Sequence, residues 1–352
     1  MIRTLILCSA AVFIFMNGCD TRSSVASMPL PSHGVYILNE GTYQSRNAEI
    51  SFYDPTSGTV YGNLYAAANA DQALGDIAND IQVADGKLFI VVNYSRKVEV
   101  IAVGTNRKIA SIPMIGEPRF IRIVSPTKAY VTNMDSTVSV LDLGTWTEVR
   151  RIRVGDYPEG ILMAGNKLFV LNGGFGSGGT ISVISVDADS VIATVATPDG
   201  PSYGVAGNDG RLYISCTGYS EYGHPENDTP GGVIVIDPVS LTVVDSLAIQ
   251  GHPGKLAIDS LNTLYVLALS STGSSSVWKI VTGPHVSVLN HALVSGSFYG
   301  IGIHATRGEL YLADAGDYVT PGRVAIHTLN GTFVRGLRSG IGVAPNGFAF
   351  VP

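Results

Sequence analysis

The chain has 352 residues, of which 14% are charged, and its formal net charge is −6. This acidic balance excludes a basic face for nucleic acid and a polybasic patch for a membrane surface. The 41 glycines and 16 tyrosines indicate many tight turns and aromatic loops, and no useful stretch of helical periodicity follows residue 33.

The first predicted elements are an export signal and a tether. Arg3 precedes an apolar run over Leu5–Met16 that is too short to span a bilayer, which is typical of a secretory signal peptide. The run ends at a small residue before Cys19, an imperfect lipobox. We therefore predict a lipoprotein signal peptide over residues 1–18, lipid on Cys19 and a flexible tether over residues 19–33. Plain cleavage just before this cysteine is the alternative.

Residues 34–352 repeat one short word seven times. Each copy is an apolar triplet with an aromatic residue at its centre, and the copies lie roughly 40 to 53 residues apart, the spacing of propeller blades. The copies are Val35-Tyr36-Ile37, Leu88-Phe89-Ile90, Ala129-Tyr130-Val131, Leu168-Phe169-Val170, Leu212-Tyr213-Ile214, Leu264-Tyr265-Val266 and Leu310-Tyr311-Leu312. The repeat predicts an all-β chain that forms a seven-bladed β-propeller.

The unit 118–154 shows the expected structure of one blade. Four short runs separated by turn residues indicate four antiparallel strands. The runs are Arg119–Ile123, Ala129–Val131, Val138–Asp142 and Val149–Val154. The chain begins on a second-type strand over residues 34–38 and ends on a first-type strand over residues 345–351. Pairing of these two strands would close the ring and leave no open sheet edge.

The connections between strands divide the predicted ring into two faces. Turns between first and second strands and between third and fourth strands are short, so we call their side the short-turn face. The other connections emerge on the opposite, long-loop face, and many are elaborated. They include residues 39–48, 66–75, 172–179, 217–232, 270–276 and 315–322. Because long loops on a rigid scaffold carry binding residues, we expect the site on the long-loop face.

Aromatic residues are concentrated in or beside these loops. They are Tyr43, Tyr94, Tyr157, Phe175, Tyr203, Tyr219, Tyr222, Tyr299 and Tyr318. Tyrosine combines a large rigid contact with a hydroxyl, which favours a binding surface. Arg96 lies in the same segment as Tyr94 and is included in the predicted ligand-binding set. The alternative is that several of these side chains only cover the seams between blades.

Proline precedes the innermost strand in five units, at Pro118, Pro158, Pro201, Pro253 and Pro345. The residues that follow are expected to surround the mouth of the central channel. They are Arg119, Glu159, Ser202, Gly254 and Asn346. We include Arg119, Glu159 and Asn346 among the ligand-binding candidates because mixed charges can orient a polar ligand, although a solvated channel lining explains them equally well.

The sequence contains no clear catalytic or metal-binding pattern. The glycine-rich segment 173–179 is followed by a strand rather than by the helix that a phosphate cradle needs. The loop 224–228 contains ligand-type side chains, but a polar loop without an ion is the simpler interpretation. Histidines are unpaired, and no G-x-S-x-G elbow occurs. We therefore predict no catalytic residue, no metal and no cofactor.

Three segments resemble YVTN/YncE-type β-propellers, and the resemblance covers residues 34–352. They are Leu264-Tyr265-Val266, Val138-Ser139-Val140-Leu141-Asp142 and Gly155-Asp156-Tyr157-Pro158-Glu159-Gly160. A narrower set looks like the Bacteroidota surface lipoproteins that capture vitamin B12 and pass it to a TonB-dependent outer-membrane transporter. This set is Leu38-Asn39-Glu40-Gly41, residues 50–55, 74–80 and 87–93, and Pro158-Glu159-Gly160. The resemblance implies a seven-bladed propeller, a lipid anchor and a corrinoid bound on one face.

Together these observations predict a non-enzymatic lipoprotein of the cell envelope, placed at the outer membrane and either surface-exposed or periplasmic. We expect its long-loop face to capture a large ligand, most plausibly a cobamide such as vitamin B12, and to pass it to an outer-membrane transporter. The membrane would be contacted only through the lipid anchor. One alternative is an envelope propeller that binds protein or glycan, and another is a propeller enzyme of the lactonase or quinoprotein type.

Overall fold

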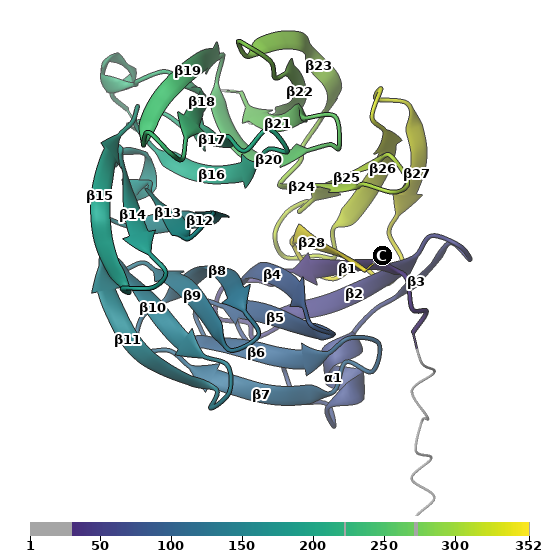
Figure 1. Ribbon diagram of the computed structural model, residues 1–352. Helices are drawn as coiled ribbons and strands as arrows, with labels where there is room; N and C mark the ends of the chain where they lie inside the picture. Colours follow the sequence, from purple (N-terminus) through teal and green to yellow (C-terminus); the bar gives the residue numbers. More distant parts are fainter. Residues whose placement is uncertain (1–29, 222, 271–273, 352) are drawn as a thin grey trace, which may run out of the picture.

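The computed structural model describes residues 30–221, 223–270 and 274–351, and its strands form seven four-stranded antiparallel sheets arranged in a ring (Figure 1). The predicted seven-bladed propeller is therefore confirmed. The predicted signal peptide, Cys19 and the tether up to residue 29 lie outside the described residues. At the end of the tether, Leu30 packs against the core of the first blade.

The four strands of each blade run from an innermost strand at the channel to an outermost strand at the rim of the ring. The blade that contains both ends of the ring has β28 (Pro345–Val351), β1 (Gly34–Asn39), β2 (Glu49–Asp54) and β3 (Thr59–Tyr61), in that order. The next has β4 (Ala78–Ala84), β5 (Lys87–Val92), β6 (Lys97–Ala102) and β7 (Lys108–Pro113). The third has β8 (Pro118–Ser125), β9 (Lys128–Asn133), β10 (Thr137–Asp142) and β11 (Thr147–Arg153).

The remaining four blades follow in chain order. They are β12 (Pro158–Ala164), β13 (Lys167–Asn172), β14 (Thr180–Ser185) and β15 (Ser190–Ala196); then β16 (Pro201–Ala206), β17 (Leu212–Cys216), β18 (Gly231–Asp237) and β19 (Thr242–Ile249). The last two are β20 (His252–Ile258), β21 (Thr263–Leu269), β22 (Ser275–Val281) and β23 (Ser287–Gly296); and β24 (Gly300–His304), β25 (Glu309–Asp314), β26 (Arg323–Thr328) and β27 (Phe333–Leu337).

The ring is closed by the two ends of the described chain. Strand β28 pairs antiparallel with β1, with Val35 opposite Phe350 and Ile37 opposite Phe348. β28 also contacts the innermost strands of both neighbouring blades, β4 and β24. The C-terminal strand therefore completes the blade that the N-terminal strand begins, as the sequence predicts.

The repeated triplets are the buried second strands of the blades. All six residues of β1 are buried, and five of the six in β5, because both faces of these strands pack against neighbouring blades. The central tyrosines are fully buried and their hydroxyls are satisfied by polar groups. Tyr36 donates to Asn106 Oδ1 at 2.9 Å, and Tyr213 donates to Asp209 Oδ2 at 2.7 Å. Tyrosine thus fills the core and ties it to the short turns.

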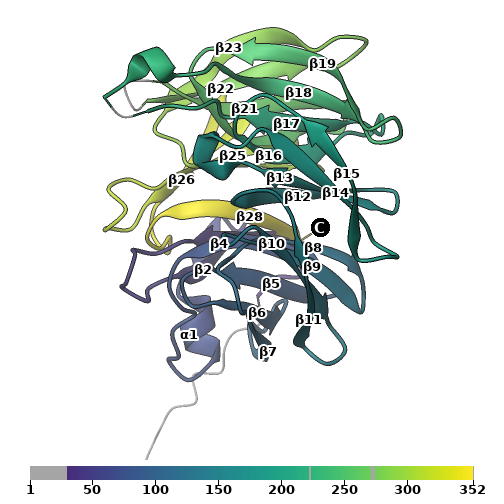
Figure 2. The same ribbon diagram turned by 90° about the vertical axis from the view of Figure 1, so that its left-hand side faces the viewer.

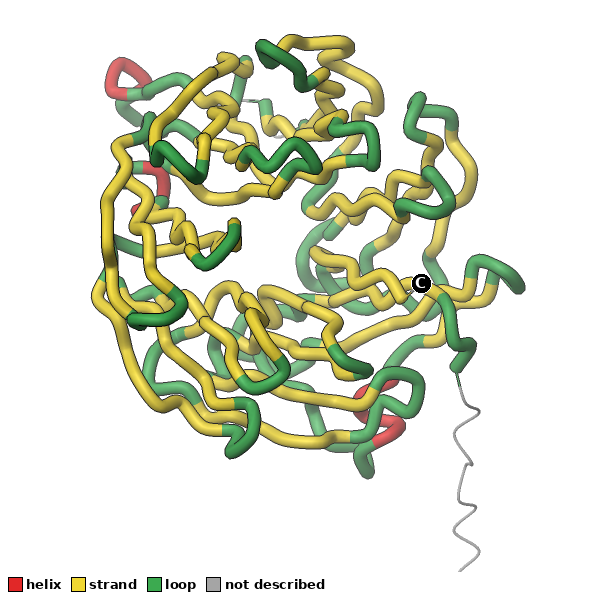
Figure 3. The backbone as a smooth tube through the Cα atoms, viewed as in Figure 1, coloured by secondary structure: helices red, strands yellow, loops and turns green. Residues whose placement is uncertain are grey.

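In the described part of the chain, helical structure is confined to connections (Figure 3). It consists there of α1 (Leu64–Ala68) and two single 3-10 turns, η1 (Gly174–Gly176) and η2 (Pro225–Asn227). Among the described residues, no helix has the length and apolarity needed to cross a membrane. Residues 66–75, which follow the start of α1, were expected on the long-loop face. Instead, Asn69 Nδ2 donates to the carbonyl of Asn106 at 2.9 Å, and Asn106 belongs to a turn of the short-turn face. This connection therefore runs along the outside of the ring.

The other elaborated connections emerge together, as the edge-on view shows (Figure 2). The loop between β25 and β26, the loop between β1 and β2, and the loop that contains η2 extend to the left in that view, while short turns lie to the right. Thr42 Oγ1 donates to the carbonyl of Tyr318 at 2.7 Å, which joins two of these loops across the closing seam.

The closing seam gives a test of this architecture. A methyl group on Gly300 would lie 2.5 Å from the carbonyl oxygen of Asn346, whereas one on Gly254 would meet its nearest backbone atom at an ordinary 3.8 Å. Because the Asn346 contact is backbone, Gly300→Ala should destabilise the ring by about 1–3 kcal/mol through overpacking. Gly254→Ala, in another innermost strand, is the matched control. Urea denaturation should show a lower midpoint for Gly300→Ala alone, and equal midpoints would contradict the close approach of the two strands at this seam.

Candidate functional site

The innermost strands begin at the long-loop face and are irregular at their first residues. The pairing register shifts just after Pro118, Pro158, Pro201 and Pro253, and similar shifts occur in β4 and β28. A β-bulge interrupts the strict alternation of side chains, so two successive residues can face the same side. In β4, for example, both Asn79 and Asp80 line the central channel.

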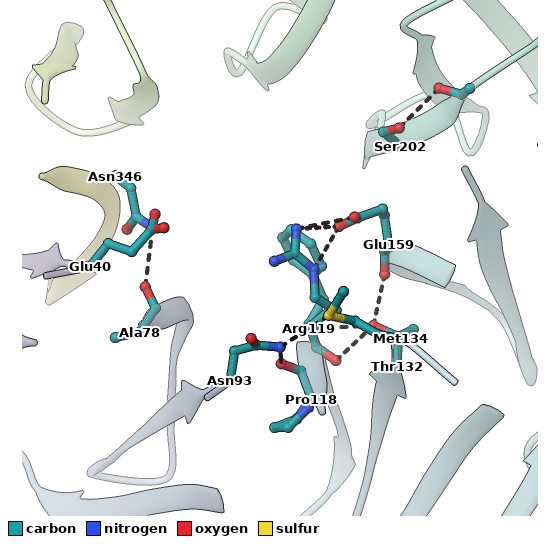
Figure 4. Close-up of polar contacts among 12 residues, drawn as sticks. Glu40, Ala78, Asn93, Pro118, Arg119, Thr132, Met134, Glu159, Ser202 and Asn346 are labelled. Atoms are coloured by element: carbon teal, nitrogen blue, oxygen red, sulfur yellow. Dashed lines mark hydrogen bonds and ion pairs between the residues drawn. The ribbon is translucent and has the colours of Figure 1, made fainter. Parts of the chain in front are cut away.

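In three blades, a polar side chain holds the first residues of the next innermost strand (Figure 4). Asn93 Nδ2 donates to the carbonyl of Pro118 at 2.9 Å, and Thr132 Oγ1 donates to the carbonyl of Glu159 at 2.8 Å. Asn346 Nδ2 donates to the carbonyl of Ala78 at 3.1 Å. These bonds satisfy carbonyls that the bulges leave outside the ladder. They also fix the position of the channel mouth.

The predicted residues Arg119 and Glu159 form an ion pair at this mouth (Figure 4). Arg119 donates from Nε and Nη2 to Glu159 Oε2 at 3.1 and 2.8 Å, and from Nη2 to Oε1 at 3.1 Å. Burial lowers the pKa of Arg119 less than Glu159 raises it, so the guanidinium stays charged. Burial raises the pKa of the Glu159 carboxyl, and Arg119 opposes that rise.

A second polar cluster lies across the mouth and is centred on Glu40, which was not among the predicted site residues. Its Oε2 accepts from the Tyr299 hydroxyl at 2.8 Å and from Asn346 Nδ2 at 2.7 Å. Lys255 Nζ donates to the carbonyl of Asn346 at 2.6 Å and lies 5.1 Å from the centre of the Tyr299 ring. The predicted residues Tyr299 and Asn346 therefore lie together, as expected. The residues that connect them, Glu40 and Lys255, were not predicted.

Below the mouth the channel widens into a cavity of about 250 Å³. Its polar lining includes Asn79, Asp80, Gln82, Arg122, Tyr203 and Lys255, and its apolar lining includes Ile81, Phe120, Ile121, Ile161, Leu162, Leu256, Ile301 and Phe348. The predicted residue Tyr203 packs edge-on against Phe120, with ring centres 5.8 Å apart. Ser202, by contrast, donates to the carbonyl of Gly200 and is not part of this lining.

Burial shifts the pKa values of three charged groups of this cavity. It lowers the pKa of Lys255 to about 8, although Glu40 and Asp80 favour its charged form. It also lowers the pKa of Arg122 and raises that of Asp80, whose oxygens accept from the backbone N–H groups of Ile81 and Ile121 at 2.9 and 3.0 Å. The Lys255 amine therefore loses its proton at a lower pH than an ordinary lysine.

On the long-loop face, aromatic side chains form three pairs, which we call the aromatic rim. The pairs are Tyr43 with Tyr94, Tyr157 with Phe175, and Tyr299 with Tyr318, with ring centres 4.7, 4.5 and 5.3 Å apart. Five of the six side chains are more than 40% exposed. The backbone of Tyr157, Phe175 and Tyr318 is left-handed, with φ of 40°, 52° and 60°. All six come from connections of the long-loop face.

The other predicted residues lie on this face with partners of their own. Arg96 forms an exposed ion pair with Glu117 at 2.8 Å. The backbone N–H of Tyr219 donates to Thr229 Oγ1 at 2.9 Å within its loop, and Tyr222 lies outside the described residues. In the loop 224–228, His224 Nδ1 lies 3.1 Å from Glu226 Oε1. Within the described part of the chain, no group of three or more His, Cys, Asp or Glu side chains could hold a metal.

Sequence similarity identifies the family of this propeller. Residues 33–321 match the family described as a domain of unknown function, DUF5074. The chain belongs to the DUF5074 family. The match ends in the loop between β25 and β26, so the strands that close the ring follow the matched segment. No curated protein matches the sequence.

Several solved structures share the fold of this DUF5074 chain. A quinoprotein alcohol dehydrogenase-like protein of Bacteroides thetaiotaomicron is 16% identical with a TM-score of 0.68, and the alignment covers 93% of this chain and 80% of that one. The periplasmic gluconolactonase of Pseudomonas aeruginosa is 15% identical with a TM-score of 0.66, covering 90% and 99%. Hydrazine synthase of Kuenenia stuttgartiensis is 20% identical with a TM-score of 0.61, covering 74% and 86%.

These similarities correct the expectation that the chain is not an enzyme. The proteins that share its fold include a gluconolactonase, a dehydrogenase-like protein and hydrazine synthase, so propellers of this shape carry enzymatic activity. The expectation rested on the lack of a recognisable catalytic motif, and such motifs do not transfer between unrelated sites on one fold. At 15 to 20% identity the similarity shows the fold, and these activities are not assigned to the DUF5074 chain.

The ion pair at the mouth gives a test of the site. Arg119→Met would leave the Glu159 carboxylate buried without its cation, which should cost about 3 kcal/mol of unfolding free energy at neutral pH. Since the pKa of Glu159 would rise further in the folded state, the loss should shrink as pH falls towards the ordinary pKa of a glutamate. Arg119→Met combined with Glu159→Gln should recover most of the stability. Urea denaturation at several pH values checks this, and a pH-independent loss would contradict it.

Proposed function

We propose that the long-loop face of this DUF5074 propeller captures a broad ligand in the cell envelope, and that the ligand is a cobamide. The observation that carries the proposal is the aromatic rim, three aromatic pairs on the face where the charged channel mouth opens, with five of their six residues exposed. Most monomeric proteins do not expose large apolar side chains grouped on one face, and such groups mark interaction sites.

The backbone of the rim supports a binding role. Left-handed φ values are uncommon for bulky residues and cost about 1–3 kcal/mol each. Three rim residues, Tyr157, Phe175 and Tyr318, adopt them, as do turn residues elsewhere such as Trp146 and Leu241. Core packing does not explain this conformation, because the Phe175 side chain is 64% exposed. Strain that presents aromatic rings to solvent is consistent with a surface prepared for a ligand.

The chemistry of a cobamide suits this arrangement. A corrin ring is broad and flat, and its periphery carries amide groups. Aromatic pairs spread around a ring can contact the apolar parts of such a ligand, while tyrosine hydroxyls and the ion pair of Arg119 and Glu159 can bind its amides. The resemblance of segments such as Leu38-Asn39-Glu40-Gly41 to vitamin B12-capturing lipoproteins points to the same ligand class.

Anchoring and delivery complete the proposal. Lipid on Cys19 would hold the propeller at the outer membrane on the tether, which lets the ring meet a TonB-dependent transporter. In that arrangement the protein raises the local ligand concentration beside the transporter. The lipobox-like sequence before Cys19 supports the anchor, and the family resemblance supports the transporter.

Isothermal titration with cyanocobalamin tests ligand capture. The unaltered protein should bind it, and Tyr43→Ala, Phe175→Ala and Tyr318→Ala should each weaken binding by about thirtyfold, since aromatic anchors at an interface contribute about 2 kcal/mol. Phe333→Ala is the matched control, because Phe333 is a similarly exposed aromatic residue on the outermost strand β27. If mixing at micromolar protein releases or absorbs no heat, the proposal that the ligand is a cobamide is wrong. If Phe333→Ala weakens binding as much as the three rim substitutions, the rim is not the binding site.

Growth with a clickable fatty acid tests the anchor. The native protein expressed in a Bacteroidota host should carry the label and partition into membranes, because a diacylated cysteine gives stable attachment. Cys19→Ser should abolish both, while Cys216→Ser, at the buried cysteine of β17, should leave labelling unchanged. Labelling that persists in Cys19→Ser would exclude this attachment site.

A further inference from the structure

The cavity below the channel mouth contains two cations with unused hydrogen-bond donors. Among the described residues, the Arg122 guanidinium has no hydrogen bond or ion pair, although it lines the cavity. Lys255 Nζ makes one hydrogen bond, to the carbonyl of Asn346. An arginine carries five N–H donors and a lysine three, so most donors of this pair remain available.

The nearby carboxylates are occupied by other donors. Both oxygens of Asp80 accept backbone N–H groups, both oxygens of Glu159 accept Arg119, and Glu40 accepts Tyr299 and Asn346. None of these carboxylates lies within ion-pair distance of Arg122 or Lys255 in the described chain. The two half-buried cations therefore keep donors without a carboxylate partner, and Asn79 Oδ1 and Asn346 Oδ1 of the same lining are acceptors without a donor.

The other residues that line the cavity limit the kind of ligand that could accept hydrogen bonds from the two cations. Ile121, Leu256 and Phe348 belong to a lining that mixes apolar and polar side chains around the two cations. A water molecule takes about 30 Å³ of liquid volume, so a cavity of about 250 Å³ has the volume of about eight water molecules. The space therefore fits a compact organic molecule and is too small for a corrinoid.

We propose that this cavity is a second binding site, distinct from the long-loop face, for a small organic anion with a carboxylate and an apolar body. The carboxylate accepts charge-assisted hydrogen bonds from Lys255 and Arg122, and the body packs on the isoleucine, leucine and phenylalanine side chains. Strands β8 and β20, which supply the two cations, lie on different sides of the channel, so the ligand bridges blades that do not touch. The site does not depend on capture of a cobamide.

The proton on Lys255 gives the site a pH dependence. Burial lowers the pKa of this amine to about 8, so it is charged below that pH and neutral above it. The groups that face it are Glu40, Asp80, Glu159 and Arg119, and the three carboxylates favour its charged form. Anion affinity should therefore fall as pH rises through about 8.

Isothermal titration of sodium benzoate into the mature chain tests this site, because benzoate has a suitable size and charge. Binding should be detected near pH 7, and Lys255→Met and Arg122→Met should each reduce it at least about tenfold. Arg150→Met removes one positive charge from the exposed outer strand β11 and should leave affinity unchanged. Neutral benzamide should bind at least about tenfold more weakly than benzoate.

Two comparisons on the unaltered protein keep the test decisive even if a variant fails to fold. Benzoate should bind more weakly at about pH 9.5 than at about pH 6.5, since Lys255 loses its proton between them, and benzamide should show no such change. Circular dichroism establishes which variants are folded. No benzoate binding at millimolar concentration, equal binding of benzamide, or unchanged affinity in folded Lys255→Met and Arg122→Met would each overturn the proposal.

Discussion

Pairing of β28 with β1 is the constraint on which the rest of this structure depends. It joins the two ends of the ring in one sheet, so that seven innermost strands surround one channel and begin at the same face. Once the ring is closed, the connections after second and fourth strands leave on the long-loop face, apart from the α1 connection, which runs along the outside of the ring. Loops far apart in sequence, such as those of Thr42 and Tyr318, then contact one another. The aromatic rim is a consequence of this closure.

The channel combines two ways of holding buried charge. Arg119 and Glu159 neutralise each other directly, and Glu40 is held by two neutral donors. Lys255 and Arg122, by contrast, are half-buried in a cavity of mixed polar and apolar lining, without a carboxylate in ion-pair contact. Charged groups without a direct partner in a cavity are candidates for ligand contacts. The charges at the mouth are therefore paired, whereas the cations below it keep hydrogen-bond donors available.

In this propeller, the residues that build the fold and the residues that form its two faces are largely different. Similar structures include a gluconolactonase and a dehydrogenase-like protein at no more than 16% identity to this chain, although their TM-scores are 0.66 and 0.68. The shared shape comes from second strands that pack between blades, and these contribute little to either face. Chemistry is placed by the connections and by the first residues of the innermost strands. Function in the DUF5074 family must accordingly be argued from those positions.

The amino-acid sequence alone determined the blade number, the closing pair and the face that carries the long loops, because apolar triplets such as Leu88-Phe89-Ile90 and the types of the terminal strands are local signals. It also selected Arg119, Glu159 and Asn346 as residues of the mouth. Only the tertiary structure decided their pairing and added Glu40, Asp80, Arg122 and Lys255. Bulges at the starts of the innermost strands turn a second residue towards the channel, and closure brings opposite blades together. Neither effect leaves a pattern in the sequence, since both depend on register and on contacts between distant blades.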